Sequence, residues 1–171
     1  MSESDGAGMR WGVKESFVDY IARAPGGQVS VTEGAGFVAE SRQFAFPLVD
    51  ATGFDVAANA GVLEFAGDVR FSGHFGFLYL PLTRPRIEVS VGVARLSFIV
   101  PDGRDGDGEP VVLAELDWPQ PAREGVLLWR STGVRLASTG APLFNGSYGA
   151  GEPLDAVTIS LPSHADVSPV Y

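Results

Sequence analysis

The chain has 171 residues with a formal net charge of −9, and 45 % of them are apolar, which is enough for one well-buried core but short for two domains. The negative charge argues against nucleic acid, whose phosphates require a basic surface, and against an anionic membrane surface. The sequence has no cysteine, so disulfides, thiolate metal sites and cysteine nucleophiles are excluded, and no apolar run is long enough to cross a membrane.

We expect residues 1–10 to form a flexible amino-terminal segment. They contain neither the basic start nor the apolar stretch of a secretory signal, so we expect a cytoplasmic protein. A single domain is expected over residues 11–161, and residues 162–171 are expected to form a carboxy-terminal tail.

One amphipathic helix is predicted near the amino end, over residues 11–24. Its apolar residues recur at spacings that line one helix face, namely Val13, Phe17, Tyr20, Ile21 and Ala24. A Pro-Gly-Gly sequence from Pro25 ends the helix, because proline has no amide donor and glycine has no preference for helix. Ser16 and Tyr20 are four residues apart, so they would point the same way. A planar ligand over this face could meet Tyr20 at a metal and Ser16 at a carboxylate.

The rest of the chain predicts a mostly β fold, an antiparallel β-sandwich-like domain with short helical turns. Short apolar or alternating segments are separated by clusters of glycine, proline and aspartate, which is typical of such domains. The predicted strands span residues 28–32, 42–48, 62–71, 75–82, 87–100, 111–116, 126–129 and 156–161.

Residues 101–110 form the clearest loop and are rich in aspartate and glycine. The composition resembles a calcium-binding loop, but Arg104 stands where a ligand belongs and no glutamate follows at the twelfth position. We therefore interpret this segment as a solvated connection between two strands.

Two isolated side chains, Tyr20 and His74, are the best candidates for a binding site. Glycines at positions 73 and 76 leave room for a flat group to approach His74, and Phe75 could lie against such a group. A tyrosine oxygen is one of the few protein ligands of haem iron, and a histidine is a suitable partner for its proton. The alternative is structural: Tyr20 belongs to the apolar helix face and finds a hydrogen-bond partner, and His74 marks the end of a strand.

Other candidates have less support. His164 lies in the predicted tail, and Tyr148 either supplies a second tyrosine ligand or caps a turn. There is no Gly-x-Ser-x-Gly motif and neither histidine lies in a recognisable triad context. A metal site of two histidines and a carboxylate would have to recruit His164 from the tail. None of the glycine-rich segments has the Lys-Ser/Thr of a phosphate loop.

Four sequence blocks together resemble the HtaA-type haem-binding domain, which occurs in haem-uptake proteins of Gram-positive bacteria. The blocks are WGVKESFVDY at 11–20, VRFSGHFGFL at 69–78, LASTGA at 136–141 and GAGEPLDAVT at 149–158. The similarity covers nearly the whole chain in the order of the family. Its most specific part is the Trp-Gly-x-Lys-x-Ser-Phe opening followed by Gly-His-x-Gly.

The resemblance implies a β-sandwich-like fold with short helices and a ferric haem b held by Tyr20 as axial ligand. His74 would be the hydrogen-bond partner of Tyr20, and Ser16 and Phe75 would be pocket residues. The implied function is haem storage, buffering or transfer without catalysis. Another haem-carrier protein would be the partner, and the chain would be a monomer or weak homodimer. The alternatives are a peroxide-using haem enzyme, since catalase also binds iron through tyrosine, and an interaction domain that has lost haem binding.

Overall fold

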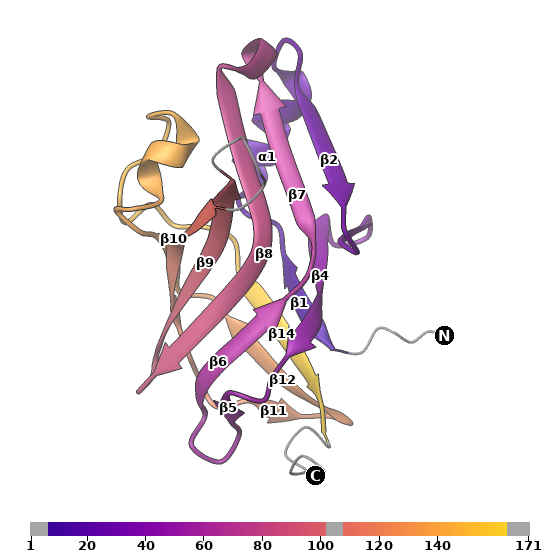
Figure 1. The fold of residues 1–171 in the computed structure, drawn as a ribbon, viewed down its shortest axis with the longest axis vertical. Coiled ribbons are helices and arrows are strands. Elements are labelled where there is room, and N and C mark those ends of the chain that lie inside the picture. The colour runs from indigo at the N-terminus through magenta and orange to yellow at the C-terminus, as the bar shows by residue number, and fades with distance from the viewer. Residues whose placement is uncertain (1–6, 102–107, 164–171) are drawn as a thin grey trace.

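The computed structural model describes residues 7–101 and 108–163, and the strands in these residues join one antiparallel sheet (Figure 1). The main path of this sheet, in spatial order, is β11 (Ala122–Arg123), β12 (Val126–Ser131), β14 (Val157–Pro162), β1 (Gly8–Trp11), β4 (Gln43–Asp50), β6 (Ala60–Phe65), β8 (Leu78–Ser90), β9 (Val93–Pro101), β10 (Gly108–Asp117) and β13 (Val134–Leu136). At its sides lie β2 (Gln28–Thr32), β3 (Gly36–Val38), β5 (Phe54–Asp55) and β7 (Asp68–Gly73). The expected mostly β, antiparallel fold is confirmed.

The sheet curls so that its two halves enclose a single core. Trp11 on β1 stacks against Phe98 on β9 with ring centroids 6.0 Å apart, although β4, β6 and β8 lie between these strands in the sheet. Phe44 on β4 likewise meets Phe71 on β7 at 5.4 Å. Such contacts between strands that are not neighbours require the sheet to fold over on itself. The period-two alternation of the sequence supplies the inward-facing residues.

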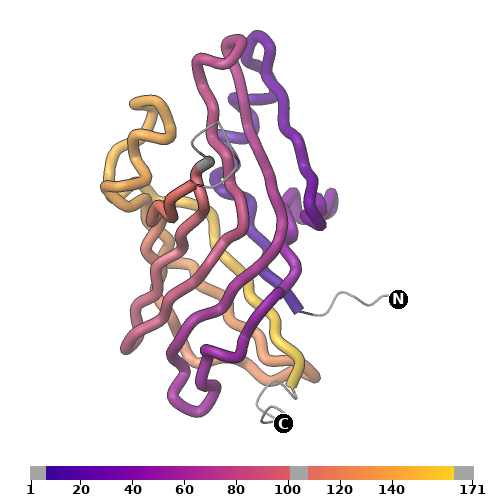
Figure 2. The backbone as a smooth tube through the Cα atoms, viewed as in Figure 1, coloured from indigo at the N-terminus to yellow at the C-terminus, as the bar shows by residue number. Residues whose placement is uncertain are grey.

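The long strand β8 changes partners along its length. Its first half pairs with β7 and its second half with β6, and the change occurs at a bulge between Thr83 and Arg86, where Arg84 has a φ of 48°. The β7–β8 hairpin therefore extends beyond the curled body, and its tip reaches the end of the molecule where the helix lies (Figure 2). The short helical turn η2 (His74–Gly76) forms this tip.

The helix α1 (Glu15–Arg23) is shorter than the sequence predicts. Phe17 and Ile21 lie one turn apart and are both buried, so the predicted apolar face packs into the core. The expected start at residue 11 is wrong, because Trp11 belongs to β1 and Val13 has a left-handed φ of 64° that interrupts the chain before the helix. The helix ends before Pro25 as predicted.

Residues 8–10 belong to a strand, which corrects the expectation of a flexible amino end up to residue 10. They pair with β14 on one side and β4 on the other, so β1 is a central strand. At the carboxyl end, Pro162 of the expected tail completes β14. His164, which we expect in that tail, lies outside the described residues.

Several predicted strands have different limits in the structure. The predicted strand at residues 62–71 is divided into β6 and β7, because Gly67 has a φ of 119° between them. Residues 75–77 form the hairpin tip, and β8 runs without interruption to Ser90. Most of the predicted loop at 101–110 lies outside the described residues, but β10 begins at Gly108. No helix in the described part of the chain is long and apolar enough to cross a membrane.

Candidate ligand-binding site

The structure brings Tyr20 and His74 together at one end of the molecule. The hydroxyl of Tyr20 is hydrogen-bonded to Nε2 of His74, and the two rings lie 5.7 Å apart at an angle of 45°. The Tyr20 side chain is 40 % exposed. Tyr20 therefore combines a fixed hydrogen-bond partner with a partly exposed side chain.

The packing of α1 determines where Tyr20 points. Phe17 lies one helical turn before Ile21, and its ring contacts Phe71 at 5.4 Å and Phe144 at 5.0 Å, both edge to face. These contacts fix the rotation of the helix about its axis. Tyr20 consequently lies at the boundary between the core and the surface, facing the tip of the β7–β8 hairpin.

His74 is held by the unusual backbone of the hairpin tip. His74, Phe75 and Gly76 all have positive φ values, of 52°, 57° and 98°. A left-handed conformation costs about 1 kcal/mol or more for a residue other than glycine, so the surrounding structure must stabilise it. The amide of His74 donates a hydrogen bond of 2.7 Å to the carbonyl of Pro25, directly after α1. The tip and the end of the helix are thereby joined.

Phe75, expected as a pocket residue, packs against the segment that follows α1. A methyl group added at Gly26 would lie only 2.9 Å from the ring of Phe75, so the ring covers the backbone of this glycine. The rest of the ring is open, and Phe75 is 81 % exposed. Phe77 at the same tip is 84 % exposed. Phe77 is not among the residues expected from the sequence, although Gly-His-Phe-Gly-Phe carries two aromatic residues around one turn.

Ser16 forms a second polar pair near the start of the same helix. Its hydroxyl lies 3.2 Å from the hydroxyl of Tyr148, which the sequence left as a ligand or a turn residue. The ring of Tyr148 packs on Phe144 at 5.5 Å, and the ammonium group of Lys14 lies 5.5 Å from its centre. Ser16 and Tyr148 are 132 residues apart, so no local sequence signal could have paired them.

The two polar pairs lie along one side of α1. Ser16 and Tyr20 are four residues apart, which corresponds to about 6 Å along the helix axis. The site therefore offers a hydroxyl pair at one end, a phenol–imidazole pair at the other, and exposed aromatic rings at the hairpin tip.

An ion pair fixes α1 to the loop before β4. Arg42 donates a hydrogen bond of 2.7 Å to Asp19 and lies 3.4 Å from Glu15. The hydrogen bond from Arg42 is the main reason that the pKa of Asp19 is lowered, and the same bond raises the pKa of Arg42. This contact fixes the part of α1 that carries Tyr20, although Tyr20 itself takes no part in it.

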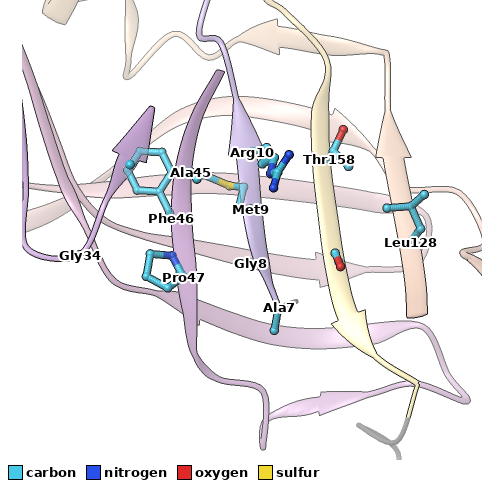
Figure 3. Close-up of a pocket in the computed structure, with 12 residues that line it drawn as sticks. Ala7, Gly8, Met9, Arg10, Gly34, Ala45, Phe46, Pro47, Leu128 and Thr158 are labelled. Carbon is cyan, nitrogen blue, oxygen red and sulfur yellow. The ribbon is translucent and has the colours of Figure 1, made fainter. Parts of the chain in front are cut away.

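Three hollows that we identify in the structure lie away from Tyr20 and His74. The largest, of about 590 Å³, is on the outer face of β1, β4 and β14 (Figure 3). A second, of about 350 Å³, lies at the bulge of β8, and a third, of about 120 Å³, lies beside Arg42. None of these three is lined by Tyr20 or His74. The pair therefore lies outside these three hollows, at a position where the Tyr20 side chain is partly exposed.

The chain is similar to proteins of one known family over most of its length. A profile of the HtaA family, described as Htaa, matches residues 6–160. The crystal structure of the C-terminal domain of HtaA from Corynebacterium glutamicum is 26 % identical, with a TM-score of 0.71 over 91 % of this chain and 96 % of that one. The N-terminal domain of the same protein is 24 % identical, with a TM-score of 0.72 over 92 % and 98 % of the two chains. The haem-binding protein HtaB from that organism is 18 % identical, with a TM-score of 0.64 over 92 % of each chain. A search of curated proteins gives no match.

Proposed function

Since this chain belongs to the HtaA family, as its sequence blocks indicate, we propose that it binds haem on the surface between α1 and the β7–β8 tip. The observation that carries this proposal is the hydrogen bond between Tyr20 and His74 at an exposed position. A structural relative is itself described as a haem-binding protein. The family match covers almost all of the described chain, including both residues.

In this proposal the phenolic oxygen of Tyr20 would hold ferric iron. The charge of the metal would favour the ionised phenolate near neutral pH, and the displaced proton would pass to solvent. His74, bonded to the same oxygen, would control how much negative charge that oxygen keeps, which is an effect of the second coordination shell on ligand strength. The present hydrogen bond already orients the imidazole for that role.

The other residues fit the remaining parts of a haem molecule. The hydroxyls of Ser16 and Tyr148 are directed toward each other and can donate to a propionate carboxylate. The exposed rings of Phe75 and Phe77 provide apolar surface for the edge of the porphyrin. Lys14 is not assigned to a haem carboxylate, because its ammonium group already contacts Glu152 at 3.2 Å and the carbonyl of Pro153 at 2.8 Å.

We infer that the chain stores, buffers or transfers haem and that it is not an enzyme. A phenolate is a hard ligand that prefers ferric to ferrous iron. Reduction of the iron or protonation of the Tyr20–His74 pair would therefore weaken the binding of haem. That property suits a protein that must release haem. His74 is bonded to the proposed ligand itself, so in this proposal it would not serve as a separate acid or base for catalysis.

The expected assembly and location stay predictions. We propose a monomer or weak homodimer in the cytoplasm that exchanges ferric haem b with another haem-carrier protein. Sedimentation of the apoprotein and of the haem-loaded protein tests the proposed oligomeric state.

A haem titration of matched tyrosine variants tests the main proposal. Ferric haem added to the apoprotein should give a saturable Soret band with the visible bands of tyrosinate ligation. Tyr20→Phe should abolish these bands. Tyr79→Phe is the control, because Tyr79 is similarly exposed at 45 % and also has a hydrogen-bond partner, Arg70. Equal haem affinity in wild type and Tyr20→Phe, with an intact fold by circular dichroism, would refute the assignment.

A further inference from the structure

The largest of the hollows identified above, on the outer face of the curled sheet, has a floor of small side chains (Figure 3). Met9 on β1 is fully buried, so its neighbours Gly8 and Arg10 face outward. The outward residues on the flanking strands are Ala45 on β4 and Ser160 on β14. With few side-chain atoms of the described residues above this part of the sheet, a groove remains on its outer face.

Two arginines and a threonine form one row across this face. Arg10 is paired with Thr158, and Thr158 is paired with Arg130 on β12. Directly opposed residues on neighbouring strands point to the same side of a sheet. Strands are spaced by about 4.8 Å, so the two arginine backbones are about 10 Å apart. Their side chains are long enough to contact the same or neighbouring carboxylates, with the Thr158 hydroxyl between them.

The charge of this row contrasts with the rest of the molecule. The chain has a net charge of −9, yet the residues that line the groove include Arg10 and no aspartate or glutamate. Within the described residues, neither Arg10 nor Arg130 forms an ion pair. By contrast, Arg42 and Arg70 are each bonded to an aspartate at 2.7 Å and 2.8 Å. Among the described residues, the charges of these two arginines are thus not neutralised by an ion pair, although the protein is acidic.

We propose that this groove docks an extended acidic segment of a partner protein. Carboxylates of the segment contact Arg10 and Arg130, and its apolar side chains pack between Pro47 and Leu128 at the two sides. From β4 to β12 the groove crosses three strand spacings, about 14 Å, which matches four or five residues of extended chain. Both β1 and β14 are paired on each side, so recognition depends on side chains and charge rather than on an added strand. The proposal does not depend on haem binding.

An NMR titration of the full, isotope-labelled chain tests this. The probe is a capped Glu-Ser-Val-Ser-Glu peptide, which in an extended chain places both glutamates and the valine on one face, and the matched control peptide has lysine in place of glutamate. We expect saturable shifts of amides in β1, β4, β12 and β14 with the acidic peptide only, and weaker binding at higher salt. Arg10→Gln with Arg130→Gln should weaken binding roughly tenfold or more. The control is the double variant Arg84→Gln with Arg95→Gln, at exposed positions on β8 and β9. It lowers the net charge by the same amount as the groove variant and should leave binding unchanged.

Thr158→Glu provides a second test that keeps both arginines. Its carboxylate occupies the row between them and should compete with the peptide, so binding should again be weakened. Several outcomes overturn the proposal. They are shifts spread over the surface, the same loss in the control double variant, no binding at millimolar peptide, or equal binding of glutarate, which would indicate a site for small anions.

Discussion

The hydroxyl of Tyr20 is hydrogen-bonded to the imidazole of His74 across 54 residues of sequence. One residue belongs to a helix whose inner face is buried, and the other to a hairpin tip with a left-handed backbone. The helix and the tip are also joined by the bond from the His74 amide to Pro25. The pair is therefore preorganised before any ligand arrives.

Replacing His74 should weaken haem binding without removing it. An outer-shell partner of a metal ligand typically contributes about 10- to 100-fold in affinity, so we expect a loss of that size in His74→Ala. Haem titration by absorbance, with the molecular mass checked by light scattering, measures it. His74→Gln keeps a hydrogen-bonding group and should recover part of the affinity. Wild-type affinity in His74→Ala would show that the bond to Tyr20 has no role in binding.

The Ser16–Tyr148 pair should recognise the carboxylates of haem. Ser16→Ala and Tyr148→Phe should each weaken haem binding several-fold, because each removes one hydroxyl donor. Neither change should affect the dimethyl ester of haem, which has no charged carboxylates. The two hydroxyls are 3.2 Å apart, so the effects should be non-additive in a double-mutant cycle. Equal losses for haem and its ester would place the carboxylates elsewhere.

Gly26 should be essential for the geometry of the hairpin tip. Gly26→Ala introduces a methyl group 2.9 Å from the ring of Phe75 at a φ of 67°. Gly146→Ala is the control, because its φ is 82° and its added methyl would have nothing within 4 Å. Both changes carry the left-handed cost of about 1 kcal/mol or more, and Gly26→Ala should cost more than the control because the ring of Phe75 must also shift. Urea unfolding measures both, and equal losses would contradict the close packing of Phe75.

Asn59 should be a major contributor to stability at the end of the molecule opposite α1. Its side-chain oxygen accepts hydrogen bonds from Trp118 at 3.0 Å and Trp129 at 2.9 Å, and its amide donates to a carbonyl at 3.0 Å. Asn59→Ala leaves these buried groups without partners, so we expect a loss of about 2–4 kcal/mol. The control is Asn145→Ala, at an exposed position with a similar φ, 57° against 56°. Tryptophan fluorescence during urea unfolding distinguishes the two, and a similar small loss in both would disprove this role.

The Asp19–Arg42 ion pair should make a small contribution that depends on pH. Its hydrogen bond lowers the pKa of Asp19. A lowered pKa stabilises the folded state above the pKa of the unfolded chain, and this stabilisation is lost as the pH falls through the folded pKa. The difference in unfolding free energy between wild type and Asp19→Asn should thus be present at neutral pH and disappear in acid. The pair is exposed, so the effect is small. A difference that does not change with pH would contradict this role for the pair.

The sequence predicted the elements whose signals are local. The alternation at residues 28–32 predicts β2 with correct limits, because a period of two is a direct consequence of strand geometry. The buried positions Phe17 and Ile21 follow from the helical period in the same way. Tyr20 and His74 were paired through the resemblance to a family, since the sequence separation alone gives no reason to place them together.

The remaining features depend on contacts between distant parts of the chain. The strand β1 has only four residues, and it is a strand because β4 and β14 both supply partners. Val13 adopts a left-handed backbone that its β-branched side chain disfavours, so no propensity could have predicted the late start of the helix. The partner of Ser16 lies 132 residues away, and its identity required the whole fold.

The joining of α1 to the hairpin tip has a thermodynamic consequence. Tyr20, which we propose as the iron ligand, meets its partner His74 only once the chain between them has folded, so an unfolded copy has no equivalent affinity. By linkage, any molecule that binds only the completed arrangement raises the melting temperature, and at a thousand times its dissociation constant it adds about 4 kcal/mol. Bound haem would then stabilise the folded state, and the haem-free protein would unfold more often and be cleaved by proteases faster.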